Sequence, residues 1–241
     1  MKFSTITNIG KIRNENEDSF SNISLGDLDF FIVADGMGGH SKGELASKLA
    51  AKLFIKYIKE ADIASYNSYI KLLEEAIFYA NEEIYKLSLE DGNIRMGTTV
   101  VCLCIDYKNK TYYLSHLGDS RAYIYRNETL SQLTRDHSLV NDLLDSGSLT
   151  EDEAANFINK SAITRAVGTE EKVVADSKFL PMEDGDIILM VTDGLTNELT
   201  DEKIRQIVKA NKDPYQISSK LIEEAIDHGG RDNITVTTIL L

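Results

Sequence analysis

Four aspartates stand where an apolar, strand-like run meets a glycine or a polar turn. They are Asp35 in FFIVADGMGG, Asp119 in YYLSHLGDSR, Asp193 in IILMVTDGL and Asp232 in GGRDNITVTTILL. Strands hold their ends rigidly and glycine permits tight turns, so we expect these carboxylates to converge on one pocket. Carboxylates at close range take up protons or bind a cation, and oxygen ligands suit Mg²⁺ and Mn²⁺. The pattern predicts a divalent-metal site.

The composition is that of a soluble globular protein, with 42% hydrophobic and 27% charged residues in 241. No linker-like stretch interrupts the chain, so we expect one domain over residues 1–241. The sequence has neither a secretory signal nor a run of ~18 apolar residues, which predicts a cytoplasmic protein without membrane insertion. Cys102 and Cys104 are two apart in a strand-like run, where they should face the same side as buried thiols.

The net charge of −13 disfavours nucleic acid as a partner, because affinity for DNA rests largely on Lys and Arg at phosphates. It does not exclude a phosphorylated substrate, since bound divalent cations would reverse the field inside the site. The glycines from Gly36 to Gly43 lack the Walker pattern, so nucleotide binding is not predicted.

Two long amphipathic helices follow the first clear strand. Asp27–Ala34 is strand-like, and apolar residues then recur at helical spacing over Glu44–Glu60 and from Ile70 to Leu87. The period next changes to two, which predicts an antiparallel meander. Its strands would be Thr98–Tyr107, Thr111–Leu117 and Arg121–Tyr125.

The polar stretch from Thr134 to Gly168 differs from its surroundings and is interpreted as an inserted flap. After it we expect a strand pair, two helices and a last strand. These are Val173–Leu180 with Asp186–Thr192, then Asp201–Ala210, Tyr215–His228 and Ile234–Leu241. Strands and helices in blocks with short strand connections favour an α+β fold with antiparallel sheets over a doubly wound parallel sheet.

Seven short motifs follow one another along the chain. They are RNENED (Arg13–Asp18), VADGMGG (Val33–Gly39), GTT (Gly97–Thr99), GDSR (Gly118–Arg121), ITRAVG (Ile163–Gly168), TDGL (Thr192–Leu195) and RDNIT (Arg231–Thr235). Any one alone would be weak. Together, in this order and over essentially the whole chain, they resemble the type 2C, metal-dependent protein phosphatases, also called the PPM family, and most closely its compact bacterial members.

The resemblance implies a central antiparallel β-sandwich flanked by helices on both sides (α-β-β-α), with the flap as an inserted subdomain. Two Mn²⁺ or Mg²⁺ ions would bind in a cleft at one end of the sheets, with a third, weaker ion beside them. By position the implied metal ligands are Asp18, Asp35, Gly36 through its backbone carbonyl, Asp119, Asp193 and Asp232. Asp35 matches the bridging carboxylate, Asp18 the acid that holds metal-bound water, and Asp119 a ligand of the third ion.

Arg13 matches the guanidinium that grips the substrate phosphate, and with Asp18 and Asp35 it forms the implied catalytic set. Its planar fork can bind two phosphate oxygens at once, unlike a lysine. Phosphate monoesters are among the slowest substrates to hydrolyse without a catalyst, and a metal pair both activates water and neutralises phosphoryl oxygens. Met37 stands where eukaryotic members have a histidine, so the proton donor stays open between His40 and a metal-bound water.

The implied function is hydrolysis of phosphoserine and phosphothreonine in proteins by direct attack of an activated water. The bacterial resemblance implies a Ser/Thr kinase and its targets as partners. Two alternatives remain: a non-catalytic pseudophosphatase, which should lack a ligand position, and a narrow phosphatase for one partner-switching regulator. We expect a monomer, because the sequence shows no heptad or repeat.

Overall fold

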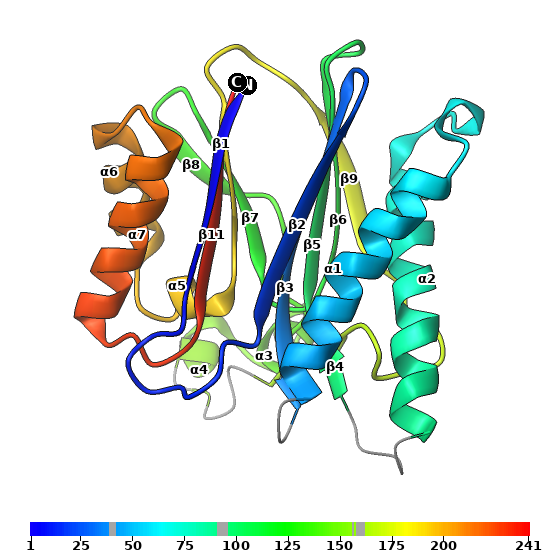
Figure 1. Cartoon of the computed structure of the whole chain (residues 1–241). Coiled ribbons are helices and arrows are strands. Elements are labelled where there is room, and N and C mark those ends of the chain that lie inside the picture. The colour runs from blue at the N-terminus through cyan, green and yellow to red at the C-terminus, as the bar shows by residue number, and fades with distance from the viewer. Residues whose placement is uncertain (39–41, 91–95, 156, 158–161) are drawn as a thin grey trace.

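Two antiparallel β-sheets stack face to face, and helices cover the outer face of each sheet (Figure 1). The computed structural model describes residues 1–38, 42–90, 96–155, 157 and 162–241. The strand order of one sheet is β1-β11-β10-β7-β8, and that of the other is β2-β3-β5-β6-β9, with β4 paired to β3. The strands are β1 Lys2–Asn8, β2 Asp18–Leu25, β3 Leu28–Gly38, β4 Met96–Thr98, β5 Val100–Asp106, β6 Thr111–Leu117, β7 Arg121–Arg126, β8 Thr129–Gln132, β9 Asp176–Pro181, β10 Ile187–Val191 and β11 Ile234–Leu240.

The central strands are apolar on both faces because each face packs against a different layer. In β3, Phe30 and Ile32 belong to the cluster under the first helices, whereas Phe31 and Val33 lie between the two sheets. Cys102 faces the helices, as does Cys104, and both thiols are free and buried, as the sequence predicts. A third apolar cluster lies under the helices of the other sheet. The α+β sandwich flanked by helices is therefore confirmed.

The helices are α1 Lys42–Glu60, α2 Tyr69–Glu90, α3 Leu139–Asp145, α4 Glu151–Ala155, α5 Asp193–Thr196, α6 Asp201–Ala210 and α7 Pro214–His228, with a short 3₁₀ turn at Ile63–Ser65. α1 and α2 cover one sheet, and α6 and α7 cover the other (Figure 1). Thr200 caps α6, because its side chain accepts a hydrogen bond from the Lys203 N–H. Pro214 begins α7. None of the helices in the described ranges is long and apolar enough to cross a membrane.

Two predicted strand pairings are wrong. β5 and β6 pair as expected, but β7 lies in the opposite sheet, and β9 and β10, predicted as a pair, also lie in different sheets. A glycine with φ +105, Gly118, turns the chain from one sheet to the other between β6 and β7. An alternating apolar pattern in the sequence indicates a strand but does not show which other strand it pairs with. Strands β1, β2 and β8 were not predicted, and the strand expected from Val173 begins at Asp176.

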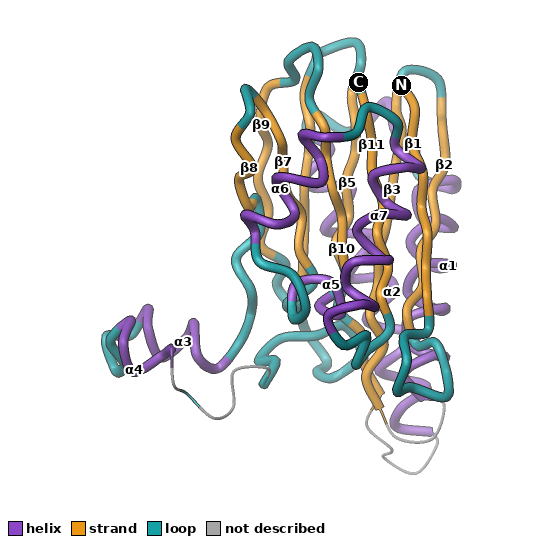
Figure 2. Tube along the Cα trace, turned by 90° about the vertical axis from the view of Figure 1, so that its left-hand side faces the viewer, coloured by secondary structure: helices purple, strands orange, loops and turns teal. Residues whose placement is uncertain are grey.

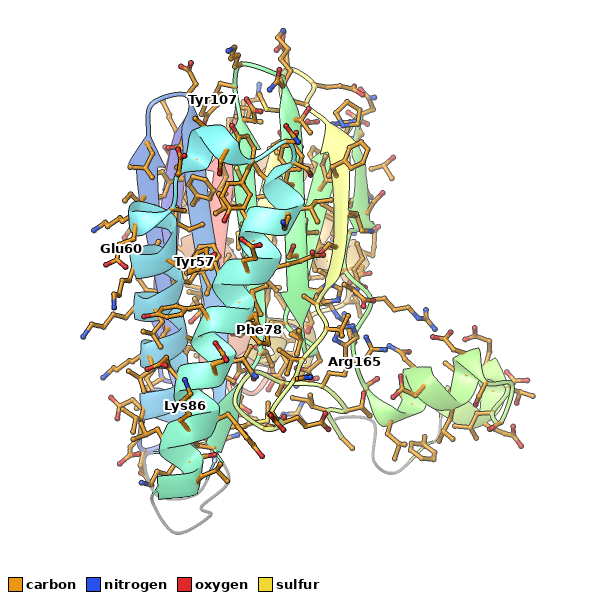
Figure 3. The ribbon with its side chains drawn as sticks, turned by 90° about the vertical axis from the view of Figure 1, so that its right-hand side faces the viewer. Tyr57, Glu60, Phe78, Lys86, Tyr107 and Arg165 are labelled. Carbon is orange, nitrogen blue, oxygen red and sulfur yellow. The ribbon has the colours of Figure 1, made fainter. Side chains whose placement is uncertain are left out.

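The segment expected to form a flap carries α3 and α4, which project away from the two sheets (Figure 2). Ser138 caps α3 by accepting a hydrogen bond from the Asn141 N–H. Arg165 lies on the return from this segment to the sheets (Figure 3), where its guanidinium contacts Asp176 at 3.0 Å.

Candidate active site

Five aspartates are presented by strand ends and turns at the end of the sandwich opposite the chain termini (Figure 1). Asp18 opens β2 and is the register partner of Asp35, near the end of β3. Asp119 lies in the turn from β6 to β7, Asp193 follows β10, and Asp232 precedes β11. The predicted convergence of dispersed carboxylates therefore has its structural basis in antiparallel strands that begin and end at one edge.

Asp18 is 7% exposed and is oriented by two threonines. Its Oδ2 accepts hydrogen bonds from the Thr192 hydroxyl at 2.9 Å and the Thr235 hydroxyl at 2.6 Å. The Thr192 hydroxyl in turn accepts from the Thr235 N–H at 2.9 Å, which ties the two strand ends together. The second carboxylate oxygen, Oδ1, is buried and has no hydrogen-bond partner among the described residues. Sequence reasoning assigned no role to these threonines, although both stand in the quoted motifs.

The backbone at Asp35 is fixed by the two threonines of the GTT motif. The Asp35 carbonyl accepts from the Thr98 hydroxyl and the Thr99 N–H, both at 2.8 Å, and the Asp35 N–H donates to the Thr99 hydroxyl at 3.1 Å. The Thr99 and Ser120 hydroxyls share a hydrogen bond of 2.7 Å. A cluster of buried hydroxyls thus holds the β3 end next to the turn that carries Asp119.

Gly36 is a position that only glycine can occupy. A Cβ there would lie 2.0 Å from the Gly43 carbonyl oxygen and 2.8 Å from that of Glu17. The Gly36 N–H donates to the Glu17 carbonyl at 3.0 Å. The start of α1 therefore packs directly on the strand end, which explains the glycine in the Asp-Gly pair by close backbone approach.

Crowding of the carboxylates disfavours their ionisation. Burial, with repulsion from Asp193 and Asp232, raises the pKa of Asp18 to about 7. Burial and the four neighbouring carboxylates raise the pKa of Asp35 well above its ordinary range. Burial, then repulsion from Asp193, raises the pKa of Asp119 to about 7. Within the described ranges the Asp119 Oδ1 also lacks a hydrogen-bond partner. Burial and the nearby Asp232 raise the pKa of Asp193 as well.

This donor set fits a hard divalent cation. It consists of carboxylate oxygens, two of which are buried without a hydrogen-bond partner, and the charges repel one another unless a cation or protons intervene. No thiol or imidazole belongs to it among the described residues, which favours Mg²⁺ or Mn²⁺ over softer metals.

Residues 9–234 match the Protein phosphatase 2C family. The chain belongs to this family. It is 35% identical to "Serine/threonine phosphatase stp" of Listeria monocytogenes serotype 4b, over 97% of this chain and 93% of the relative. It is 34% identical to "Protein phosphatase PhpP" of Streptococcus pneumoniae, over 99% and 97% of the two chains.

Solved structures of 2C phosphatases have the same fold. The S. agalactiae serine/threonine phosphatase superposes with a TM-score of 0.92 at 34% identity, covering 100% of this chain and 99% of that one. The catalytic domain of PstP, solved in complex with two manganese ions, superposes with a TM-score of 0.82 at 29% identity, covering 98% and 96%. This member of the 2C family is a metal-dependent serine/threonine protein phosphatase.

In this 2C phosphatase, hydrogen bonds to two neighbouring residues attach the loop that carries Arg13 to the carboxylate cluster. The Arg13 guanidinium donates to Asp232 Oδ2 at 2.7 Å and is half exposed. The Asn233 side chain accepts from the Glu17 N–H at 2.8 Å and donates to the Glu15 carbonyl at 2.9 Å. Asn233 therefore holds the loop that presents Arg13. Its role was not predicted from sequence, although it lies in RDNIT.

A cavity of ≈ 630 Å³ opens beside the carboxylates. Asp119, Asp193 and Asp232 line it, together with Asn141 and Phe157 from the segment that carries α3 and α4. The predicted Gly36 ligand and the Asp18 and Asp35 side chains do not line this cavity.

Two histidines near Asp119 form a separate group that could suggest a second metal site. The atoms of His116, His137 and Asp176 lie within 4.8 Å of one another. However, the His116 Nε2 lies 2.8 Å from the Arg135 carbonyl, which can only accept, and the His137 Nδ1 accepts from the Gly118 N–H at 3.1 Å. The ring centroids lie 4.7 Å apart with an interplanar angle of 16°, so the in-plane lone pairs of the two rings lie in nearly parallel planes, which disfavours one ion shared between them. His40, the predicted alternative proton donor, lies outside the described residues.

Proposed function

We propose that this phosphatase hydrolyses phosphoserine and phosphothreonine esters in proteins at the carboxylate cluster, by direct attack of water and without a covalent enzyme intermediate. The observation that carries the proposal is the buried set of aspartates with raised pKa values and two buried oxygens without hydrogen-bond partners. Such a set is costly unless it binds cations.

We infer the ligands residue by residue. Asp35, Asp193, Asp232 and the Gly36 carbonyl would hold two Mn²⁺ or Mg²⁺ ions, and Asp119 with Asp193 would hold a third. Bound there, the cations would supply an activated water and neutralise the phosphoryl oxygens. Asp18 is positioned by two threonine hydroxyls on Oδ2, which leaves Oδ1 to accept a hydrogen bond from that water.

Arg13 would bind the phosphate through its planar fork. Its guanidinium is held by Asp232 on one side only, and it is 47% exposed, so donors remain for phosphate oxygens. The Asp232 contact keeps the charged group at the edge of the cluster where the phosphate would lie. Met37 offers no proton to the leaving alkoxide, so the two candidate donors that we propose are a metal-bound water and His40.

The test is substitution of Asp193 by asparagine. The amide keeps the shape of the side chain and its contact partner Asn197, yet it removes one anionic ligand. We expect Mn²⁺-dependent hydrolysis of p-nitrophenyl phosphate to fall at least ~100-fold, on the order of 3 kcal/mol of transition-state stabilisation. Asp184→Asn, at an exposed turn residue, is the matched control and should leave the rate unchanged. Undiminished turnover in Asp193→Asn would reject the assignment.

We further propose that the protein acts in the cytoplasm as a monomeric single domain over residues 1–241, opposing a Ser/Thr kinase and acting on that kinase's targets. Similarity to PhpP and stp, both of them bacterial phosphatases, supports this setting. The segment 134–168 would act as a flap that tunes substrate choice, since Asn141 and Phe157 line the cavity together with the carboxylates. Exchanging it for a relative's segment should change phosphopeptide preference while p-nitrophenyl phosphate hydrolysis persists.

A further inference from the structure

A second groove, of ≈ 680 Å³, runs between β2 and α1. One end of it is lined by Asp18, which belongs to the carboxylate cluster, and its floor contains apolar side chains such as Phe20 and Ile55. Along α1 its rim carries four lysines, Lys48, Lys52, Lys56 and Lys59, and one acidic residue, Glu60, at the far end. The groove is therefore continuous with the active-site end and differs from it in charge.

The helix that forms this rim is positively charged, although the protein as a whole is acidic. α1 carries five lysines against two glutamates, a net charge of +3, whereas the whole chain has a net charge of −13. The groove lysines recur three or four positions apart, so they form one stripe along the helix. Figure 3 shows the two sides of α1: Tyr57 lies toward α2, where its hydroxyl donates to Glu75, and Glu60 points away from α2.

Two lysines of the stripe are available for a ligand. Lys48 pairs with Glu44 on its own helix, and the Lys56 amine lies 3.1 Å from the Tyr79 hydroxyl. Across the ranges that the structure describes, Lys52 and Lys59 have neither an ion pair nor a hydrogen bond, and both are exposed. Unpaired cations beside an apolar floor are suited to a ligand with carboxylate and apolar groups.

The other wall of the groove is an edge strand. β2 is at the end of its sheet's strand order and, in the described part of the chain, forms a ladder only with β3. An edge strand presents unpaired backbone groups to which an extended peptide can add. The stripe from Lys48 to Lys59 spans ~16 Å at 1.5 Å per helical residue, which matches about five residues of extended chain.

We propose that this groove binds an acidic, extended segment of the phosphoprotein substrate, adjoining the residue that is dephosphorylated. The inference rests on the proposed function, because it places the segment next to Asp18 while the phosphate lies in the carboxylate cluster. The acidic groups of the segment contact Lys52 and Lys59, and its apolar groups lie on Phe20 and Ile55. A recessed groove with an open strand edge fits a peptide better than a flat membrane surface.

The test compares phosphothreonine peptides that share a core and differ in a five-residue extension, either Asp/Glu-rich or Ser/Gln-rich, placed before or after the phosphothreonine. We expect the acidic extension, on one of the two sides, to lower KM by roughly 3- to 20-fold at low salt, the range for two exposed ion pairs. High salt should remove the preference. The double variant Lys52→Glu/Lys59→Glu should lose it, with p-nitrophenyl phosphate hydrolysis unchanged.

The matched control is the double variant Lys108→Glu/Lys212→Glu, at exposed lysines in the connections from β5 to β6 and from α6 to α7, which makes the same change in net charge and should keep the preference. An equal loss in this control would assign the effect to net charge and overturn the proposal. Binding of a fluorescent acidic peptide, followed by anisotropy, reports on the groove without turnover. Active wild-type enzyme with no preference for either acidic extension would also overturn it. The proposal would likewise be overturned if the protein sedimented with phosphatidylserine vesicles through Lys52 and Lys59 and showed no preference between the peptides. Failure of the proposed function would appear separately, as absent p-nitrophenyl phosphate hydrolysis by the wild type.

Discussion

Replacing Asp119 by asparagine should stabilise the metal-free protein although it removes a predicted metal ligand. Asp119 is 8% exposed, and burial together with Asp193 raises its pKa from 3.8 to about 7. A carboxyl that binds its proton more tightly in the folded than in the unfolded state loses folding stability when it ionises. This cost is absent below pH ~4, grows as the pH rises, and is complete above pH ~7.

The magnitude follows from the two pKa values. Their difference corresponds to roughly 4 kcal/mol at about 1.4 kcal/mol per pKa unit, and entry of water into the cavity would reduce this to about 2 to 4 kcal/mol. In a protein of this size that is a rise in Tm of about 5 to 15 °C. The neutral amide in Asp119→Asn would also reduce the repulsion on Asp35, because Asp119 is one of the carboxylates that raise the pKa of Asp35.

The assay is thermal or urea unfolding in EDTA at pH 8 and again at pH 4.5. Asp119→Asn should exceed the wild type at pH 8, and most of the gain should vanish at pH 4.5. Asp184→Asn, at an exposed turn, should change neither value. With saturating Mn²⁺ the difference in stability should shrink or change sign, because binding of the cation stabilises the wild type more than the variant. If the variant is no more stable than the wild type in EDTA at pH 8, the ionised carboxylates do not destabilise the metal-free protein and the reasoning is wrong.

Three further outcomes follow from the contacts described. Arg13→Lys should raise KM for phosphopeptides about 10-fold with kcat nearly kept, since lysine cannot grip two oxygens; a larger fall in kcat than in affinity would contradict a binding role. Asn233→Ala should raise KM in steady-state assays and lower the free energy of unfolding by ~1 to 3 kcal/mol, because it releases the loop bearing Arg13. Asp186→Ala should lower the free energy of unfolding in urea by about 3 to 5 kcal/mol by leaving Arg126 without its buried partner, while turnover at 25 °C stays at the wild-type level.

Sequence reasoning located most elements because their apolar periods are long and regular. The α1 and α2 patterns extend over several turns, and the buried run of β3 ends in an unmistakable glycine loop. Strand β1 was missed because its residues are only partly buried and alternate weakly, as expected for an edge strand. The sheet partners of β7 and β9 could not be predicted. The same turn residues can connect two strands of one sheet or two strands of different sheets, so the turn does not show which strands pair.

The candidate site was predicted from motif order, and the structure adds the contacts that position it. Asp18 and Asp35 are 17 residues apart yet face each other in register, which alternation alone does not reveal. The threonines Thr98, Thr192 and Thr235 look like ordinary strand residues in sequence. Only the three-dimensional arrangement shows that their hydroxyls bond to the aspartates.

Two buried aspartates at opposite ends of the sandwich differ in how their negative charge is compensated. Asp186 precedes β10 at the end near the chain termini, and its carboxylate accepts from Arg126 Nε at 2.7 Å and from the Tyr112 hydroxyl at 3.1 Å. Asp119, at the other end, is also buried, yet its Oδ1 has no hydrogen-bond partner in the part of the chain that the structure describes. The charge that most raises the pKa of Asp119 is another carboxylate, Asp193. The same fold thus gives Asp186 an arginine and a tyrosine as partners and leaves the acids at the other end in mutual repulsion, which is the property on which the proposed cation site depends. The stability lost at the catalytic end would return on metal binding, so folding and metal loading of this phosphatase should be thermodynamically linked.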